Sequence, residues 1–474
     1  MIRRVLSGLI CLLLLGACSP HTRIKVEHDF ELPGRYVEAG DLDRVDHLLG
    51  NWWERFGDAD LNRLIEESLE ANLDLEQALA RLRQSEALLR SASAARYPTL
   101  SLGGDTRKGS QQGMSGEVQG EDYSLSVAAS YELDLWGKNA ARNQGAAFDQ
   151  GAAQQEFKSL QLSLAARVAD AYFLLIEQRS QLQLADQSIE AYSQSLDMVE
   201  RRYRGGLVPA VDFYLARQNL ASAQAIRESN DSAMKMAEHA LAILIGRYPG
   251  DEVAGQLVRL PSPPESFPAG LPSELLTRRP DLRAALLRVK ANDERVAVAI
   301  ADRFPSINLL GSYGTGRNTF SVPTISGEFW SLAAGLALPV IDGGRRRAEV
   351  DRQQAVVAES LARYRQTVLI AFQEVEDALV RNDNTERRIA YLIKAERAAA
   401  DALRLSVDRY RYGLSEYLQV VTAQVFHFQI QGSLIAARRQ MLSDRISLAR
   451  ALGGEWPTND EKQNQENTPS EDQQ

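Results

Sequence analysis

Residues 182–203 read LQLADQSIEAYSQSLDMVERRY, and this stretch decides the fold. Its apolar and small side chains recur at alternating steps of three and four residues, at Leu182, Ala185, Ile189, Tyr192, Leu196, Val199 and Tyr203. This spacing follows the heptad rule of coiled coils, in which one side of a helix packs along a neighbouring helix. The sequence therefore predicts a long helix that needs parallel neighbours.

The spacing of the prolines indicates how far such helices extend. No proline occurs in residues 99–208 or 340–456. We therefore predict long helices over 138–204 and 345–411, each about 100 Å long at 1.5 Å per residue. The second helix follows the same rule, at Ile389, Ile393, Ala400, Leu403, Val407 and Tyr410.

The chain also aligns with itself, without a gap, at an offset of 207 residues. The matched pairs include Arg96-Tyr97-Pro98 with Arg303-Phe304-Pro305, Arg202-Tyr203-Arg204 with Arg409-Tyr410-Arg411, Gly206-Leu207 with Gly413-Leu414, and Gly246 with Gly453. Matched Pro, Gly and Tyr at turns rarely arise by chance, so one structural unit is predicted to occur twice. The predicted units are residues 61–246 and 268–453, joined by a linker at 247–267.

Each unit is predicted to contain a helix, two strands, a long helix and a returning helix. Alternating hydrophobicity places the strands at about 98–107, 122–134, 305–314 and 329–339, and the returning helices at 209–246 and 416–452. Loops rich in Gly, Ser and Gln are expected at Thr106–Asp122 and Thr315–Glu328. The strands have the length of transmembrane strands, with aromatic residues such as Trp136 and Trp330 near their ends. A soluble β-sandwich flanked by helices is the alternative.

The N-terminus has the layout of a secretory signal peptide. Arg3 and Arg4 precede an apolar run that is too short to span a bilayer, and Leu15-Gly16-Ala17-Cys18 follows. The cysteine resembles that of a lipobox, which predicts a signal peptide at 1–17, a covalent lipid on Cys18 and an anchored segment at 18–60. Ser19 implies sorting to the outer membrane. An ordinary signal peptide with an incidental cysteine is the alternative.

Composition narrows the function classes further. With 54 Lys and Arg against 63 Asp and Glu, the net charge is −9, which argues against nucleic acid as a partner. Because no later segment has 18 consecutive apolar residues, no transmembrane helix is predicted, and a membrane could be crossed only as a β-barrel. Residues 454–474 are predicted to be a closing segment followed by a disordered acidic tail.

Five motifs resemble the TolC-like outer-membrane efflux factor family, in its OprM/NodT-type lipoprotein branch. They are the lipobox, Trp53-Glu54-Arg55-Phe56-Gly57-Asp58, Leu271-Pro272-Ser273-Glu274-Leu275-Leu276 with Arg279-Pro280-Asp281, Asp342-Gly343-Gly344-Arg345, and Leu452-Gly453-Gly454-Glu455-Trp456. The resemblance implies a mixed α+β membrane protein: a homotrimer whose 12-stranded outer-membrane β-barrel continues into a periplasmic α-helical barrel. Four strands per chain fit this, because bacterial barrels start at eight and closure needs several chains.

The resemblance also implies a passive duct that exports small molecules such as drugs, with a periplasmic adaptor and an inner-membrane transporter of RND type as partners. It implies no enzymatic activity, no metal and no cofactor beyond the lipid, and we find no metal-ligand or nucleophile motif. A lipid-anchored periplasmic coiled-coil adaptor and a lipoprotein that tethers the envelope remain alternatives.

By the same resemblance, the turns after the long helices form the periplasmic tip, where the duct closes and the adaptor docks. The adaptor-docking turns would be Gly205, Gly206 and Leu207, and Gly413 and Leu414. The gate positions would be Tyr203, Arg204, Asp212, Tyr410, Arg411, Leu418 and Thr422. Aspartate rings of the family fall at Gln419 and Thr422 here, which puts a carboxylate gate in doubt. Tyr410 could instead be only the last packing residue of the heptad seam.

Overall fold

The computed structural model describes residues 21–24, 35–37, 51–113, 116–251, 259–267, 272–320 and 324–454. The signal peptide, Cys18 and the acidic tail lie outside these residues. The chain divides into two compact units. Unit 1 comprises residues 1–29, 81–154 and 284–366, and unit 2 comprises residues 30–80, 155–283 and 367–474.

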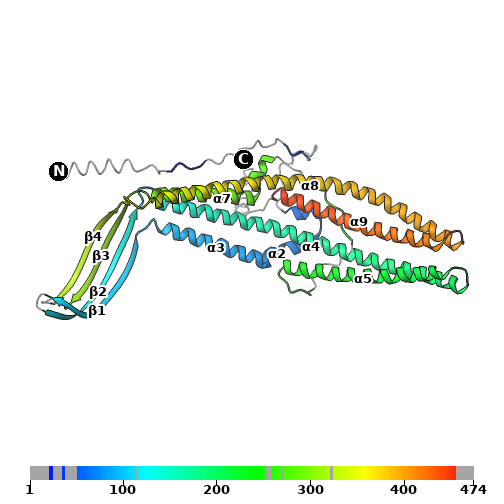
Figure 1. Cartoon of the computed structure of the whole chain (residues 1–474), viewed down its shortest axis with the longest axis horizontal. Coiled ribbons are helices and arrows are strands. Elements are labelled where there is room, and N and C mark those ends of the chain that lie inside the picture. The colour runs from blue at the N-terminus through cyan, green and yellow to red at the C-terminus, as the bar shows by residue number, and fades with distance from the viewer. Residues whose placement is uncertain are drawn as a thin grey trace, which may run out of the picture. The chain divides into compact units, whose positions relative to one another are not determined.

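Long helices and one sheet make up the described chain (Figure 1). Along the chain they are η2 (Trp52–Phe56, a 3-10 helix), α2 (Ala59–Ala71), α3 (Leu73–Ala94), β1 (Thr99–Gly113), β2 (Gly116–Leu133), α4 (Lys138–Arg204), α5 (Ala210–Leu244), α6 (Pro272–Arg278), α7 (Pro280–Ala301), β3 (Ser306–Asn318), β4 (Ile325–Ala337), α8 (Arg345–Arg411) and α9 (Tyr417–Ala451).

Three pairs of helices have equal lengths in the two halves, whereas α2 and α6 differ, with 13 and 7 residues. Helices α3 and α7 have 22 residues each, α4 and α8 have 67, and α5 and α9 have 35. Each later helix begins 207 residues after its counterpart, since α4 starts at residue 138 and α8 at 345. The long helices cover the predicted ranges, and the returning helices are shorter than predicted by one or two residues at each end.

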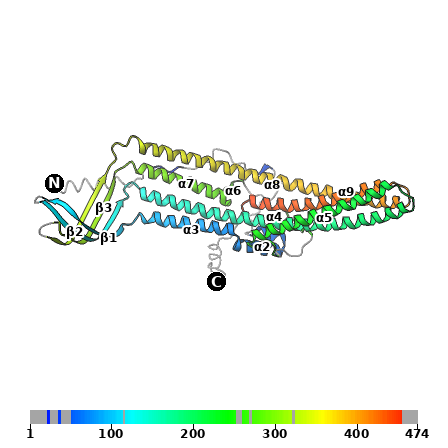
Figure 2. The same cartoon turned by 60° about the horizontal axis from the view of Figure 1, so that its bottom comes forward.

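Within unit 2 the long helices are folded into hairpins with the returning ones. Helix α5 runs back beside the second part of α4, and α9 beside the second part of α8 (Figure 2). Polar pairs join them: Arg179 of α4 bonds Glu238 of α5 at 3.0 Å, and Asn382 of α8 donates to the backbone carbonyl of Asp444 in α9 at 3.0 Å. The heptad seam therefore finds its neighbours inside the same chain.

The predicted first loop is wrong, because most of Thr106–Asp122 is strand. Strands β1 and β2 pair residue by residue from Thr99↔Ser130 to Gly113↔Gly116. Cross-strand contacts stabilise this Gly- and Ser-rich stretch, and Lys108 lies 2.6 Å from Glu121 on the facing strand. The second loop is also shorter than predicted, since β3 and β4 pair as far as Asn318↔Ile325.

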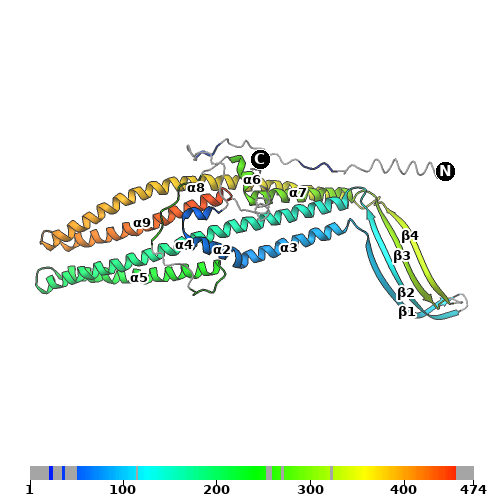
Figure 3. The ribbon, with the colours of Figure 1, turned by 180° about the vertical axis from the view of Figure 1, so that it is seen from behind.

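The four strands form one antiparallel sheet in the order β1-β2-β3-β4 (Figure 3). The described part of the chain offers no partner for the outer edges of β1 and β4. On β4, Trp330, Leu332 and Leu336 share one face and are more than 70% exposed, while the Ser331 hydroxyl on the other face bonds Ser312 at 2.8 Å. The face with Trp330 is thus mainly apolar and unburied, and the face with Ser331 carries mostly small residues together with Phe329 and Leu310.

In unit 2, a hydrogen-bond network joins the start of α2 to α4. Asp58 caps α2 by accepting the amides of Asp60 and Leu61 through one carboxylate oxygen, and its other oxygen accepts the Tyr172 hydroxyl at 2.8 Å. Burial, together with the Asp58 carboxylate, raises the pKa of Tyr172. This network fixes the start of α2 against α4.

Contrary to expectation, one described helix contains a window long and apolar enough to cross a membrane by composition. This helix is α4, whose apolar window of 18 residues has a mean hydropathy of 1.3. Since 56% of that window is buried inside the chain, packing accounts for its apolar character.

Candidate functional site: the helical tip

The turns after α4 and α8 have the same backbone design. Leu207 donates its amide to the carbonyl of Arg202 at 2.9 Å, and Leu414 does so to that of Arg409 at 2.8 Å. These are Schellman bonds, which need a left-handed residue inside the turn, and Gly206 and Gly413 supply it with φ of 72° and 73°. Gly205 keeps a negative φ and needs no such freedom.

A buried cluster lies just inside the two turns. It contains Val199 of α4, Ala216 of α5, Tyr410 of α8, and Tyr417, Val420 and Val421 of α9. The rings of Tyr410 and Tyr417 lie 5.5 Å apart, and burial raises the pKa of both hydroxyls. Because all four helices contribute, this cluster joins the two hairpins of the chain.

Arg202 of the first hairpin contacts the cluster at Tyr410. It was not among the gate residues predicted from the sequence. Its guanidinium donates to the Tyr410 carbonyl at 2.6 Å and stacks over the Tyr410 ring at 4.7 Å. It also lies against the second turn, since a Cβ on Gly413 would sit 3.9 Å from it. Arg202 is therefore the charged link between the turns, and its alignment with Arg409 was the signal in the sequence.

Tyr203 and Tyr410, which align in the repeat, have different environments. Tyr203 is 42% exposed and stacks on Phe213 of its own hairpin, with ring centroids 5.6 Å apart. Tyr410 is 2% exposed, and its hydroxyl has no hydrogen-bond partner among the described residues. Within the chain Tyr410 is thus a buried packing residue of the cluster.

The other predicted gate residues lie on the surface of the tip. Leu418 is 56% exposed, and the Thr422 hydroxyl bonds back to the Leu418 carbonyl at 2.8 Å. Arg204 pairs with Glu200 of its own helix at 2.5 Å. Asp212 is half-buried, and burial together with the Glu416 carboxylate raises its pKa. Exposed positions there also include Arg411, Leu207 and Leu414.

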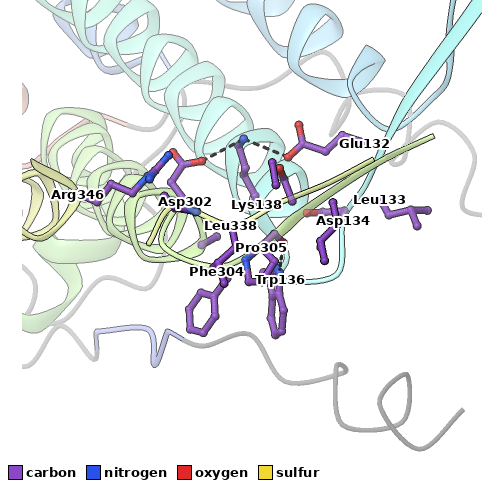
Figure 4. A pocket seen from close by; sticks show the side chains of 15 residues that line it. Glu132, Leu133, Asp134, Trp136, Lys138, Asp302, Phe304, Pro305, Leu338 and Arg346 are labelled. Carbon is purple, nitrogen blue, oxygen red and sulfur yellow. Dashed lines mark hydrogen bonds and ion pairs between the residues drawn. The ribbon is translucent and has the colours of Figure 1, made fainter. Parts of the chain in front are cut away.

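A second polar site lies in unit 1, where strands pass into helices (Figure 4). Lys138 bonds Glu132 at 3.2 Å and Asp302 at 3.1 Å, and these carboxylates raise its pKa against the effect of burial. Trp136 stacks on Phe304 at 4.8 Å and donates to the Pro305 carbonyl. These contacts brace the junction beside a cavity of about 580 Å³. Among the described residues, no group of three His, Cys, Asp or Glu side chains is placed to hold a metal.

The four-stranded sheet and the paired long helices are similar to those of solved outer-membrane channels. The model of the family described as "Outer membrane efflux protein" matches residues 64–247 and 271–454, which start 207 residues apart. The chain belongs to this family.

Individual proteins agree with the family assignment. The pyoverdine export outer membrane protein OpmQ of Pseudomonas aeruginosa is 31% identical over 95% of this chain and 97% of its own length. The outer membrane protein OprJ of the same species is 30% identical over 95% of each chain. The solved structure of the channel OprN superposes with a TM-score of 0.86, at 28% identity, over 92% of this chain and 99% of that one.

The chain is therefore the outer-membrane channel component of an efflux system, and its helical portion is periplasmic. This assignment decides against a soluble adaptor, an envelope tether and a soluble β-sandwich.

Proposed function

We propose that three copies of this chain form a passive duct with a 12-stranded barrel. The observation that carries this proposal is the sheet, whose four strands leave two edges open. Bacterial barrels have at least eight strands and leave no edge in the hydrocarbon. Three sheets of four strands joined edge to edge meet both needs, and twelve strands can enclose an open lumen, whereas side chains would fill a barrel of eight. The equal helix lengths and the two family matches at one offset support an internal two-fold repeat over residues 61–246 and 268–453.

The partners proposed are a periplasmic adaptor at the turns Gly205-Gly206-Leu207 and Gly413-Leu414, and an inner-membrane transporter of RND type that selects small-molecule cargo such as drugs. A covalent lipid on Cys18 would add an anchor in the outer membrane. The duct itself would bind no cofactor and catalyse no reaction.

The gate proposed is the ring of exposed Leu418 side chains with Thr422, held at rest by the link between the two hairpins of each chain. An apolar ring can close a pore by dewetting. We place the holding contact at Arg202 on Tyr410, because the Tyr410 hydroxyl bonds no described residue.

Trp330→Arg should impair assembly, whereas Ser331→Arg should be tolerated. Trp330 and Ser331 are neighbours on β4 whose side chains point to opposite faces of the sheet. On the lipid face Trp330→Arg costs about 2–4 kcal/mol at the midplane and less near the interface, and Ser331→Arg on the lumen face costs little. The yield of SDS-resistant trimer from outer membranes measures the difference, and equal yields would contradict the barrel.

Cys18→Ser should remove the lipid and leave the channel assembled. Intact-mass spectrometry of the purified mature protein should show the wild type carrying acyl mass and the variant lacking it. Trimer yield should change little, because the barrel holds the protein in the membrane by itself. A wild-type protein without acyl mass would remove the lipoprotein assignment and leave the channel proposal standing.

A further inference from the structure

Two adjacent carboxylates on α7 are buried. Asp293 and Glu294 are 6% and 2% exposed. Carboxylates are rarely so buried unless they are paired, because a charge removed from water needs a compensating partner. The partners here come from the N-terminal segment His21–Ile24, about 270 residues away in the sequence.

The segment is bound through side chains and backbone together. His21 Nε2 lies 2.9 Å from Asp293 Oδ1, and the Ile24 amide donates to Asp293 Oδ2 at 3.0 Å. Arg23 Nε donates to Glu294 Oε1 at 2.6 Å. The backbone bond to Ile24 fixes the register of the segment on α7, which a charge pair alone would not do.

Helix α4 shields the same pair from another side. A Cβ on Gly145 of α4 would lie 3.4 Å from the Cβ of Glu294, so the helices approach closely there. The aligned positions of the first repeat, on α3, are Glu86 and Ala87, which are less buried. The paired carboxylates thus occur in one repeat only, at the place where the N-terminal segment lies.

We propose that Asp293 and Glu294 form a docking site for the segment behind the lipid anchor and thereby fix where the anchor enters the membrane. This inference rests on the acylation of Cys18 proposed above. Cys18 precedes His21 by three residues, and three residues of chain span at most about 10 Å. Asp293 lies eight residues before the end of α7 at Ala301, about 12 Å along the helix, and β3 begins at Ser306.

Because these two lengths are similar, the docked segment lies close enough to the start of β3 for an anchor on Cys18 to reach the periplasmic ends of the strands. Docking would therefore hold the acyl chains where the inner leaflet of the outer membrane meets the sheet. Without docking, the whole N-terminal segment would link the lipid to the rest of the protein, and the position of the lipid in the membrane would not be fixed.

Limited trypsin digestion of the purified full-length protein in detergent tests the docking. Cleavage after Lys25 should be at least about ten times faster in Asp293→Asn/Glu294→Gln than in wild type, because the segment loses its charged partners. Asp351→Asn/Glu359→Gln makes the same charge change at exposed positions of the same unit and should be cut at the wild-type rate. Equal rates in all three proteins would overturn the docking site.

A second variant tests the contact from the segment. His21→Ala/Arg23→Gln leaves α7 intact, so it tests the site even if the α7 variant fails to fold, and it should show the same acceleration after Lys25. The mass of the released peptide separates the two proposals. An acylated peptide released faster from both variants supports the anchor site, whereas an unacylated peptide from wild type overturns the anchoring role and leaves the docking measured.

Discussion

Arg202→Ala is expected to make the channel open at least about ten times more often in planar bilayers than the wild type. The change removes a charge-assisted hydrogen bond to the Tyr410 carbonyl, worth about 1.5–3 kcal/mol, and a cation–π contact of about 0.5–2 kcal/mol. If these contacts hold the hairpins together only in the resting state, their loss shifts the closed–open equilibrium by tenfold for each 1.4 kcal/mol.

Arg409→Ala is the matched control for this prediction. Arg409 occupies the aligned position in the second repeat and is exposed. Within the described ranges its side chain bonds only across its own turn, to the Leu414 carbonyl at 3.3 Å. Its removal should leave the opening frequency close to that of wild type. If both variants open alike, the link between the hairpins does not hold the gate; if neither opens, the constriction lies away from the tip.

Gly246→Ala is expected to lower the unfolding free energy by about 2–5 kcal/mol and to reduce the yield of folded protein. Gly246 has a φ of 76°, which costs a residue with a side chain about 1–2 kcal/mol. A Cβ there would lie 2.4 Å from the Ala71 carbonyl oxygen at the end of α2. Backbone cannot rotate away as a side chain can, so overpacking adds about 1–3 kcal/mol. Thermal denaturation of the purified protein measures the loss.

Gly206→Ala separates backbone strain from crowding. Gly206 has nearly the same φ, 72°, but nothing lies within 4 Å of a Cβ built on it. This variant should therefore lose only the conformational part, about 1–2 kcal/mol. A loss in Gly246→Ala no larger than in Gly206→Ala would show that α2 gives way to the added methyl group.

The long helices could be predicted from the sequence because two independent observations agree. Both the absence of proline and the heptad spacing predict helix in the stretches that form the two helices of 67 residues. The tips of the strands could not. Residues such as Gly109 and Ser110 have low strand propensity, and they are strand because β2 lies opposite with matching bonds and an ion pair. That pairing partner is invisible to a local pattern.

The tip shows the same limit at the level of single residues. Tyr203 and Tyr410 lie in nearly identical local sequences, so the sequence assigns both to the gate. Their difference in burial comes from the neighbouring hairpin, through Tyr417 and Arg202. The sequence shows Arg202 only through its alignment with Arg409 in the second repeat. The alignment does not predict which of these two arginines contacts the turn of the other hairpin.

The unpaired edges of the sheet affect how each newly secreted copy folds and assembles. Every residue of β4 is exposed in the single chain, and no strand in the described part of the chain pairs with the backbone N–H and C=O groups along its outer edge. Such an edge pairs with any extended segment that it meets, so a newly secreted copy is prone to aggregation until others arrive. For the proposed trimer, folding and assembly become one concentration-dependent event, and the apparent stability depends on how many copies the cell supplies at once.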